Sequence, residues 1–252
     1  MQKTLFISDL HLCESRPDIT ALFVEFIQTT AVDCDALYIL GDFFEVWVGD
    51  DDDSSLHKEV AITLRQLSDG GVPVFFIHGN RDFLLGKSYA TQSGMKLLPE
   101  ESIIDLYGER VLIMHGDSLC TQDLAYQKFR KKSRSWWWPR LMLLLPLSYR
   151  QKLGKSARDK SKLAQMDLAQ MNMDLDILDV TPEAVIEVME KHQVKTLIHG
   201  HTHRPDQHDI QLAHSTGKRI VLGDWYTQGS YLIVTPDTRE LIFRPLPKLG
   251  AE

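Results

Sequence analysis

The chain is poor in cysteine and has no long apolar run, and both absences narrow what it can be. Its 252 residues hold three cysteines, Cys13, Cys34 and Cys120, with no Cys-x-x-Cys pair, which argues against a disulfide scaffold and favours a reducing cytoplasm. The longest apolar run, Leu141 to Leu147, is interrupted by Pro146 and is too short to span a bilayer. The first residues lack the basic and apolar regions of a secretory signal, so we expect none.

What the sequence does contain is a hydrophobic fraction of 43%, enough for a sizeable core in one α/β domain. Its net charge of −7 is unevenly distributed. Between Tyr126 and Lys162 there are twelve Lys or Arg and one acid, Asp159, so this basic block carries +11 and the rest of the chain −18. A basic block with aromatic residues indicates an anionic partner: nucleic acid, anionic lipid or a phosphorylated substrate. A solvated helical face is the simpler alternative.

The first half of the chain alternates between strand-like and helix-like segments. Strands are expected near residues 4–8, 36–40, 73–77 and 110–115. Helices are expected over 19–30 and 56–67, with Pro17 as a helix start and Gly70-Gly71 as a helix stop. This alternation predicts a sheet covered by helices. After a helix to Lys191 and a strand from Thr196, antiparallel strands of a second sheet are expected near 208–213, 219–222, 230–234 and 240–243.

The segment 123–177 breaks this alternation. It contains a triple tryptophan, Trp136 to Trp138, the leucine-rich run and a helical stretch rich in Lys, Arg, Met and Gln. We expect a helical cap inserted over the C-terminal end of the sheet, with residues 1–122 and 178–252 forming the core. Pro139 and Pro146 should break the cap into short helices. The acidic run from Asp50 to Asp53 is interpreted as a solvated loop rather than a metal site.

Five strand-like runs end in side chains that can bind metal. In an open α/β sheet, ligands bind at the carboxyl ends of the strands. One pocket should therefore collect Asp9, His11, Asp42, Asn80, His115, His201 and His203. Imidazole nitrogens with carboxylate and amide oxygens suit Mn, Fe or Zn. Seven ligands are too many for one ion and suit two ions that share a carboxylate, as in phosphoryl chemistry. Each motif is weak alone, and buried core histidines are the alternative for Gly-His-x-His, but the ordered set is specific.

This ordered set resembles the calcineurin-like metallophosphoesterases, from Leu5 to about Asp224. The resemblance implies a β-sandwich flanked by helices, with a helical cap insertion. It also implies that Asp9, His11 and His203 hold one metal ion. Asn80, His115 and His201 would hold the other, and Asp42 would bridge the two.

The chain departs from the family pattern at Arg81. The usual Gly-Asn-His-Asp/Glu is here Gly79-Asn80-Arg81-Asp82. In phosphomonoesterases of the family that histidine helps the leaving alkoxide. A phosphate leaving group needs little protonation, because its second pKa is about 6, and a guanidinium suits phosphate oxygens. The substitution favours a pyrophosphate bond over a phosphomonoester; a structural ion pair between Arg81 and Asp82 is the alternative.

Around these motifs the chain is similar to the branch of the family that cleaves a UDP-linked diacylated glucosamine in lipid A biosynthesis. This resemblance implies a hydrolase in which a water activated by two Mn²⁺ per chain attacks the α-phosphorus, giving UMP and the sugar 1-phosphate. It implies a peripheral location on the anionic cytoplasmic face of the cell inner membrane, with no nucleic acid and no obligate protein partner. Asn80, Arg81 and His201 would be catalytic. Substrate contacts would come from these three residues, from Asp123 and, in the cap, from Ser161 and Lys162.

Other functions remain open on the residues alone. A generic nucleotide pyrophosphatase or phosphodiesterase fits the same fold. A metal-free binding scaffold is disfavoured because all seven ligand positions are filled. A nuclease would suit the basic block, although the triple tryptophan and the leucine run favour acyl chains over stacked bases. Simple packing within the cap is the alternative for each tryptophan.

Overall fold

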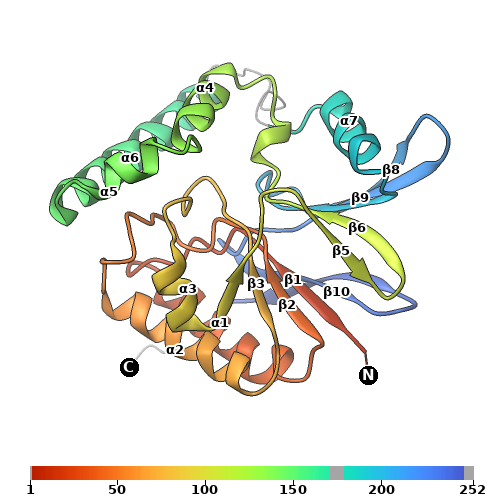
Figure 1. Ribbon diagram of the computed structural model, residues 1–252, viewed down its shortest axis with the longest axis horizontal. Helices are drawn as coiled ribbons and strands as arrows, with labels where there is room; N and C mark the ends of the chain where they lie inside the picture. The colour runs from red at the N-terminus through yellow and green to blue at the C-terminus, as the bar shows by residue number, and fades with distance from the viewer. Residues whose placement is uncertain (1, 171–178, 247–252) are drawn as a thin grey trace.

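Two mixed sheets face each other at the centre of the protein (Figure 1). The computed structural model describes residues 2–170 and 179–246, and for residues 160–170 the backbone alone. The first sheet has the order β11-β10-β1-β2-β3-β4, with bounds β1 Thr4–Ile7, β2 Ala36–Ile39, β3 Val74–Phe76, β4 Met95–Leu97, β10 Gln228–Val234 and β11 Arg239–Pro245. The second has the order β5-β6-β7-β9-β8, with bounds β5 Ser102–Leu106, β6 Glu109–Ile113, β7 Thr196–His199, β8 Asp206–Gln211 and β9 Thr216–Val221. The expected β-sandwich is confirmed.

Strand β1 illustrates why the central strands are apolar throughout. Successive side chains of a strand point to opposite faces. Phe6 faces the second sheet in a core shared with Ile113 and Ile198, whereas Leu5 and Ile7 pack toward the helices of the outer layer. Strands buried on both faces lose the alternation of apolar and polar residues, and all four residues of β1 are buried. Because β1, β2 and β3 run parallel and in register, their carboxyl ends lie at one edge.

Helices cover the outer face of each sheet (Figure 1). Helices α1 (Pro17–Phe26), α2 (Ser55–Asp69) and α3 (Lys87–Ser93) lie on the first sheet, and α7 (Pro182–His192) packs on the second. A short π-helix, η1 (Ile27–Ala31), continues α1, and a single 3₁₀ turn, η2 (Asp117–Leu119), follows β6. Helix α1 begins at Pro17 and α2 ends before Gly70, as predicted.

Three helices form the cap, α4 (Leu124–Ser133), α5 (Trp138–Leu143) and α6 (Leu147–Gln170), which projects beyond the carboxyl ends of the strands (Figure 1). Pro139 lies in the first turn of α5, where a missing N–H is tolerated, and Pro146 directly precedes α6. The breaks were correctly predicted, but α6 has 24 residues and is not short. The division into a core of residues 1–122 and 178–252 and a cap of 123–177 stays a prediction, and its second boundary lies outside the described residues.

Two expectations about the sheets were wrong. The four C-terminal strands do not complete one sheet. Strands β8 and β9 join the second sheet, whereas β10 pairs antiparallel with β1 and extends the first. The five ligand-bearing strands are likewise divided between two sheets rather than one. Within residues 2–170 and 179–246, no helix combines the length and apolarity that crossing a bilayer requires.

Candidate metal and phosphate site

The seven predicted ligands converge where the strand ends of both sheets meet. Ligand atoms of Asp9, His11 and His203 all lie within 4.8 Å of one another, and so do those of Asp42, His115 and His201. The seventh, Asn80, places Oδ1 3.1 Å from His115 Nε2. The structure thus brings together two groups of nitrogen and oxygen donors, of a kind that suits Mn, Fe or Zn.

The backbone at these positions is unusual. Among the described residues, seven non-glycine residues have a left-handed backbone, and five of them belong to the ligand set. Those five are Asp9 (φ 55°), His11 (52°), Asp42 (51°), His201 (72°) and His203 (56°). A non-glycine residue with positive φ is uncommon and costs energy, and such strain gathers at functional sites. The chain therefore turns sharply after β1, β2 and β7, so that these five side chains enter the pocket.

Hydrogen bonds outside the pocket orient the ligands. His115 Nδ1 donates to the carbonyl oxygen of Leu40 at 2.8 Å, which leaves Nε2 unprotonated toward the pocket in the neutral imidazole. Asp9 Oδ2 accepts from Ser8 Oγ at 2.6 Å and from the backbone N of His201 at 2.9 Å. These contacts fix the direction of the remaining donor atoms.

His11 Nε2 is buried without a hydrogen-bond partner, whereas Asp9 Oδ1 faces His203 Nε2 at 3.3 Å and His11 Nδ1 faces Glu45 Oε2 at 3.1 Å. Buried polar atoms are rarely left unsatisfied. His11 Nε2 lies 4.0 Å from Asp42 Oδ2, and the other Asp42 oxygen lies 3.6 Å from His115 Nε2. Asp42 therefore directs one oxygen toward each group of ligands. This donor set fits a pair of metal ions.

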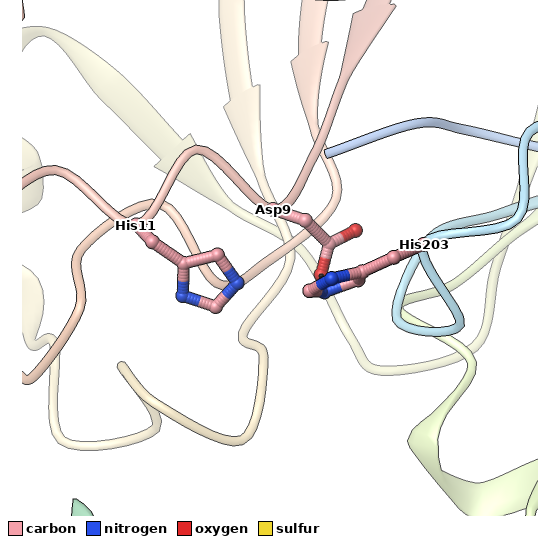
Figure 2. Close-up of side chains that lie close together, drawn as sticks. All are labelled: Asp9, His11 and His203. Atoms are coloured by element: carbon pink, nitrogen blue, oxygen red, sulfur yellow. Dashed lines mark ion pairs between the residues drawn. The ribbon is translucent and has the colours of Figure 1, made fainter. Parts of the chain in front are cut away.

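The Asp9 carboxylate and the His203 imidazole point toward each other, from the loops that follow β1 and β7 (Figure 2). His203 Nε2 lies 3.3 Å from Asp9 Oδ1. Burial lowers the pKa of His203, but the Asp9 carboxylate outweighs it and raises this pKa to about 9. Burial and the neighbouring His115 lower the pKa of His201 to about 4. At neutral pH His201 is therefore ready to bind a metal ion, whereas His203 must first release a proton.

Arg81 does not pair with its neighbour Asp82. The carboxylate of Asp82 is fully buried and accepts from the backbone N of Gly79 and of Phe43, both at 2.7 Å. Burial and the Asp42 charge raise the pKa of Asp82 to about 6. The Arg81 guanidinium instead borders the pocket, with Nε buried, without a hydrogen-bond partner and 4.0 Å from Asp42 Oδ2. The structural ion-pair alternative for Arg81 is therefore contradicted.

A central cavity of about 260 Å³ lies over the two ligand groups. Its lining includes His11, Asp42, Asn80, Arg81, Asp123, Tyr126, Arg158, His201, His203 and Tyr226. Asp123 lies at the start of α4, where its Oδ1 accepts from the backbone N of Tyr126 at 2.9 Å. It therefore caps a helix and borders the cavity at once. The side chains of Ser161 and Lys162 lie outside the described residues.

Part of the basic block holds the cap on the core. Four of its arginines form ion pairs with acidic residues of the core: Arg130 with Asp117 and Glu100, Arg134 with Glu100, Arg150 with Asp51, and Arg158 with Glu45. The acidic run is therefore not simply a solvated loop. Asp51 pairs with the cap, and Asp50 accepts from the backbone N of Gly86 and Tyr89 at the start of α3.

Sequence reasoning missed four residues that shape the cavity. Glu45 Oε2 lies 3.1 Å from His11 Nδ1, and Tyr226 stacks on His11 with ring centroids 4.9 Å apart. Tyr126 donates to Asp117, and Arg158 reaches Glu45 from the cap. Glu45 could have been found from the sequence, because it belongs to the motif Gly41-Asp42-x-x-Glu45. No sequence motif marks Tyr126, Arg158 or Tyr226.

An apolar chamber of about 470 Å³ adjoins the central cavity beneath the cap. It shares Asn80, Arg81, Tyr126 and Arg158 with that cavity, and is otherwise lined mainly by Trp47, Phe83, Leu84, Phe129, Trp138, Met142, Leu153 and Ala157. Of the triple tryptophan, only Trp138 lines it. Trp136 is 77% exposed and Leu144 82% exposed, so part of the triple tryptophan and of the leucine-rich run faces outward.

The chain matches the family model described as calcineurin-like phosphoesterase over residues 2–205. It is 53% identical over 242 residues to a protein of Escherichia coli O81 named UDP-2,3-diacylglucosamine hydrolase, covering 96% of this chain and 99% of that protein. A Salmonella paratyphi B protein of the same name is 52% identical over 243 residues, with the same coverage.

Proposed function

Because the chain belongs to the calcineurin-like phosphoesterases, we propose that it hydrolyses the pyrophosphate bond of UDP-2,3-diacylglucosamine. Attack at the α-phosphorus would give UMP and 2,3-diacylglucosamine 1-phosphate. The observation that carries this proposal is an apolar chamber joined to a site for phosphate chemistry. Burying an acyl chain in such a chamber contributes about 0.8 kcal/mol to binding per CH₂. A hydrolase of soluble nucleotides has no acyl chain to bury and needs no such chamber.

The ligand geometry supports two ions, which we propose to be Mn²⁺. Asp9, His11 and His203 would hold one, and Asn80, His115 and His201 the other. Asp42, with one oxygen toward each group, would bridge them. When bound, such ions neutralise phosphate oxygens and lower the pKa of water into the neutral range.

Arg81 is proposed to stabilise the leaving group. It borders both the central cavity and the apolar chamber, so in the proposed complex it would lie between the reacting phosphorus and the acyl chains. Its backbone N donates to Asp42 Oδ1 at 2.8 Å, which fixes its position. The leaving group is a sugar phosphate that carries its own negative charge, so a permanent cation assists it and no proton donor is needed.

Two further contacts follow from the same placement. Asn80 and His201 line the central cavity beside Arg81 and can hydrogen-bond phosphate oxygens. Asp123 borders the cavity at the cap and can accept a hydrogen bond from a sugar hydroxyl. The proposed contacts from Ser161 and Lys162 stay a prediction.

The outer surface of the cap supports peripheral binding to the anionic inner membrane. Trp136, Leu141 and Leu144 are exposed in and around α5, and so are three cations, Arg140 of α5 and Lys131 and Lys132 of α4. Exposed apolar side chains flanked by cations are typical of segments that lie in a membrane interface. The arginines that pair with core acids lie under the cap, so Lys131, Lys132 and Arg140 on its outer surface can contact anionic lipid.

Hydrolysis in ¹⁸O water tests the proposed reaction. Enzyme with Mn²⁺ and UDP-2,3-diacylglucosamine should release UMP that carries the label, because attack at the α-phosphorus places the solvent oxygen there. A soluble UDP-sugar is the control and should react far more slowly. Label in the sugar phosphate would overturn the site of attack, and equal rates on both substrates would overturn the lipid specificity.

A further inference from the structure

A second cavity of about 760 Å³ opens beside the central one. Its wall combines charged and polar side chains with apolar ones such as Ile19, Val46 and Val48, and we call it the polar cavity after the former. Its walls include Ser15 and Glu14 from the loop before α1 and Gln151 and Lys155 from α6. We propose that this polar cavity holds the uridine half of the substrate. This inference rests on the proposed function and adds where the nucleotide lies.

One stripe of α6 separates the polar cavity from the apolar chamber. Arg150, Gly154 and Arg158 are spaced by four residues and so lie on one helical face. Arg150 pairs with Asp51 and donates to the carbonyl of Val48, and Arg158 pairs with Glu45. At Gly154 a Cβ would lie 2.7 Å from a methyl group of Val46 and 3.0 Å from one of Val48. Residues 150–158 of α6 therefore meet segment 45–51 at three successive turns, between the two cavities.

The two flanks of that stripe differ in chemistry. Leu153 and Ala157, on one flank, line the apolar chamber. Gln151 and Lys155, on the other flank, line the polar cavity. Helical spacing places these pairs on opposite sides of the stripe. The same helix thus presents an apolar face to one cavity and a polar face to the other.

Both cavities reach the reacting centre, but at different ligands. The polar cavity shares His11, Arg158 and Tyr226 with the central cavity, whereas the apolar chamber joins it at Asn80 and Arg81. A substrate held by its diphosphate over the two ligand groups would direct its acyl chains into the chamber. Its nucleoside, which is attached to the other phosphate, would then lie in the polar cavity.

The polar cavity offers the groups that a nucleoside requires. Ribose hydroxyls donate to carboxylates, and uracil presents both a donor and carbonyl acceptors. Glu14 and Asp52 supply carboxylates, and Gln151 supplies an amide whose nitrogen lies 3.3 Å from Asp52 Oδ2. The volume lies within the range usual for small-molecule sites.

Two matched substitutions test the assignment. Ser15→Trp would fill the polar cavity, and Ala157→Phe would fill the apolar chamber; both side chains are small and exposed. In calorimetric titrations of the Mn²⁺-loaded enzyme, we expect Ser15→Trp to weaken UMP binding by about tenfold or more, the loss of one good contact. It should leave binding of the diacylated sugar phosphate unchanged. Ala157→Phe should show the reverse, and thermal melts verify that both variants fold.

Chemical labelling provides a second measurement on the unsubstituted enzyme. Cys13 lines the polar cavity and is half-buried, whereas Cys34 and Cys120 are buried and serve as references. UMP, but not the lipid product, should slow alkylation of Cys13. An unprotected Cys13, or UMP binding that Ala157→Phe weakens and Ser15→Trp does not, would overturn the assignment. If the cavity assignment failed but the enzyme still released UMP from the substrate, the proposed function would stand. If UMP protected Cys13 but the substrate were not hydrolysed, the proposed function would fail and the cavity assignment would stand.

Discussion

Replacing Arg150 with alanine should loosen the cap without unfolding the core. The Arg150 side chain is only 3% exposed, and its guanidinium makes a bidentate ion pair with Asp51 of the core. It also donates to the carbonyl of Val48, in the core, and to that of Leu145, in the cap, the latter at 2.9 Å. All of these contacts lie on the boundary between cap and core.

The expected cost follows from the solvent exposure of the partners. Asp51 is 57% exposed, so water can replace its lost partner at little cost. The buried carbonyl of Val48 loses a charged donor, and a buried group left unsatisfied costs about 1–3 kcal/mol. The carbonyl of Leu145 is half-buried and lies in the cap with Arg150, so its loss adds little to the cost. At about 1.4 kcal/mol per factor of ten, local opening of the cap should become about five- to 150-fold more frequent.

Hydrogen exchange measured by mass spectrometry reports this opening directly. Amides of α6 should exchange faster in Arg150→Ala by that factor, whereas amides of β1 should not change. Arg140→Ala is the matched control, because Arg140 is an exposed arginine of the cap that contacts Trp136 within it. If the amides of α6 exchanged at the same rate in Arg150→Ala and Arg140→Ala, the contacts of Arg150 with the core would not hold the cap in place.

Four other perturbations test the site and the cap surface. Asp42→Ala should remove both metal ions but leave the fold, and elemental analysis that finds two ions in the variant would exclude a bridging role. Arg81→Lys keeps the charge but loses the guanidinium geometry, so kcat should fall by about 10²–10³ as for other lost transition-state donors; unchanged kcat/KM would refute its role. Metal-free protein should lose stability as pH rises from about 6.5 to about 9, because His203 stays protonated in the folded state up to the higher value and its stabilisation is complete only below the lower one. Thermal melts of His203→Gln should show a smaller slope, because the pKa of His115 is also raised, its burial being outweighed by the carboxylates of the site. Binding to anionic vesicles should weaken as salt increases, because the cations around α5 are exposed; flotation assays that show no salt dependence would exclude an electrostatic component.

The ligand set could be predicted because each ligand follows a recognisable strand. A strand predicts where its carboxyl end lies, and His115, for example, follows the apolar run Val111 to Met114, which begins in β6. The distribution of strands between two sheets was not predictable in the same way. Strands β7 and β10 each contain a short apolar run, and nothing local distinguishes the sheet that each one joins. Short elements such as β4, with three residues, carry too little pattern to detect.

The contacts of the cap show a second limit. A run of twelve Lys and Arg against one acid predicts an anionic partner, but a charge does not specify which anion it meets. Arg158 meets Glu45, 113 residues away, and Arg130 meets Asp117 and Glu100. Such pairs depend on the placement of whole helices. Sequence reasoning therefore assigned to external partners some charge that the protein uses internally.

The five ligand residues with a left-handed backbone lower the stability of the fold that holds them. Each non-glycine residue in that conformation costs roughly 1 kcal/mol or more, so the five from Asp9 to His203 together approach the net stability of a typical domain, about 5–15 kcal/mol. Glycine at these positions would relieve the backbone and delete the donors. A screen that selects variants for thermal resistance alone should therefore accumulate changes at these positions and erode the site. Stability and catalysis would have to be selected together in any effort to improve this enzyme.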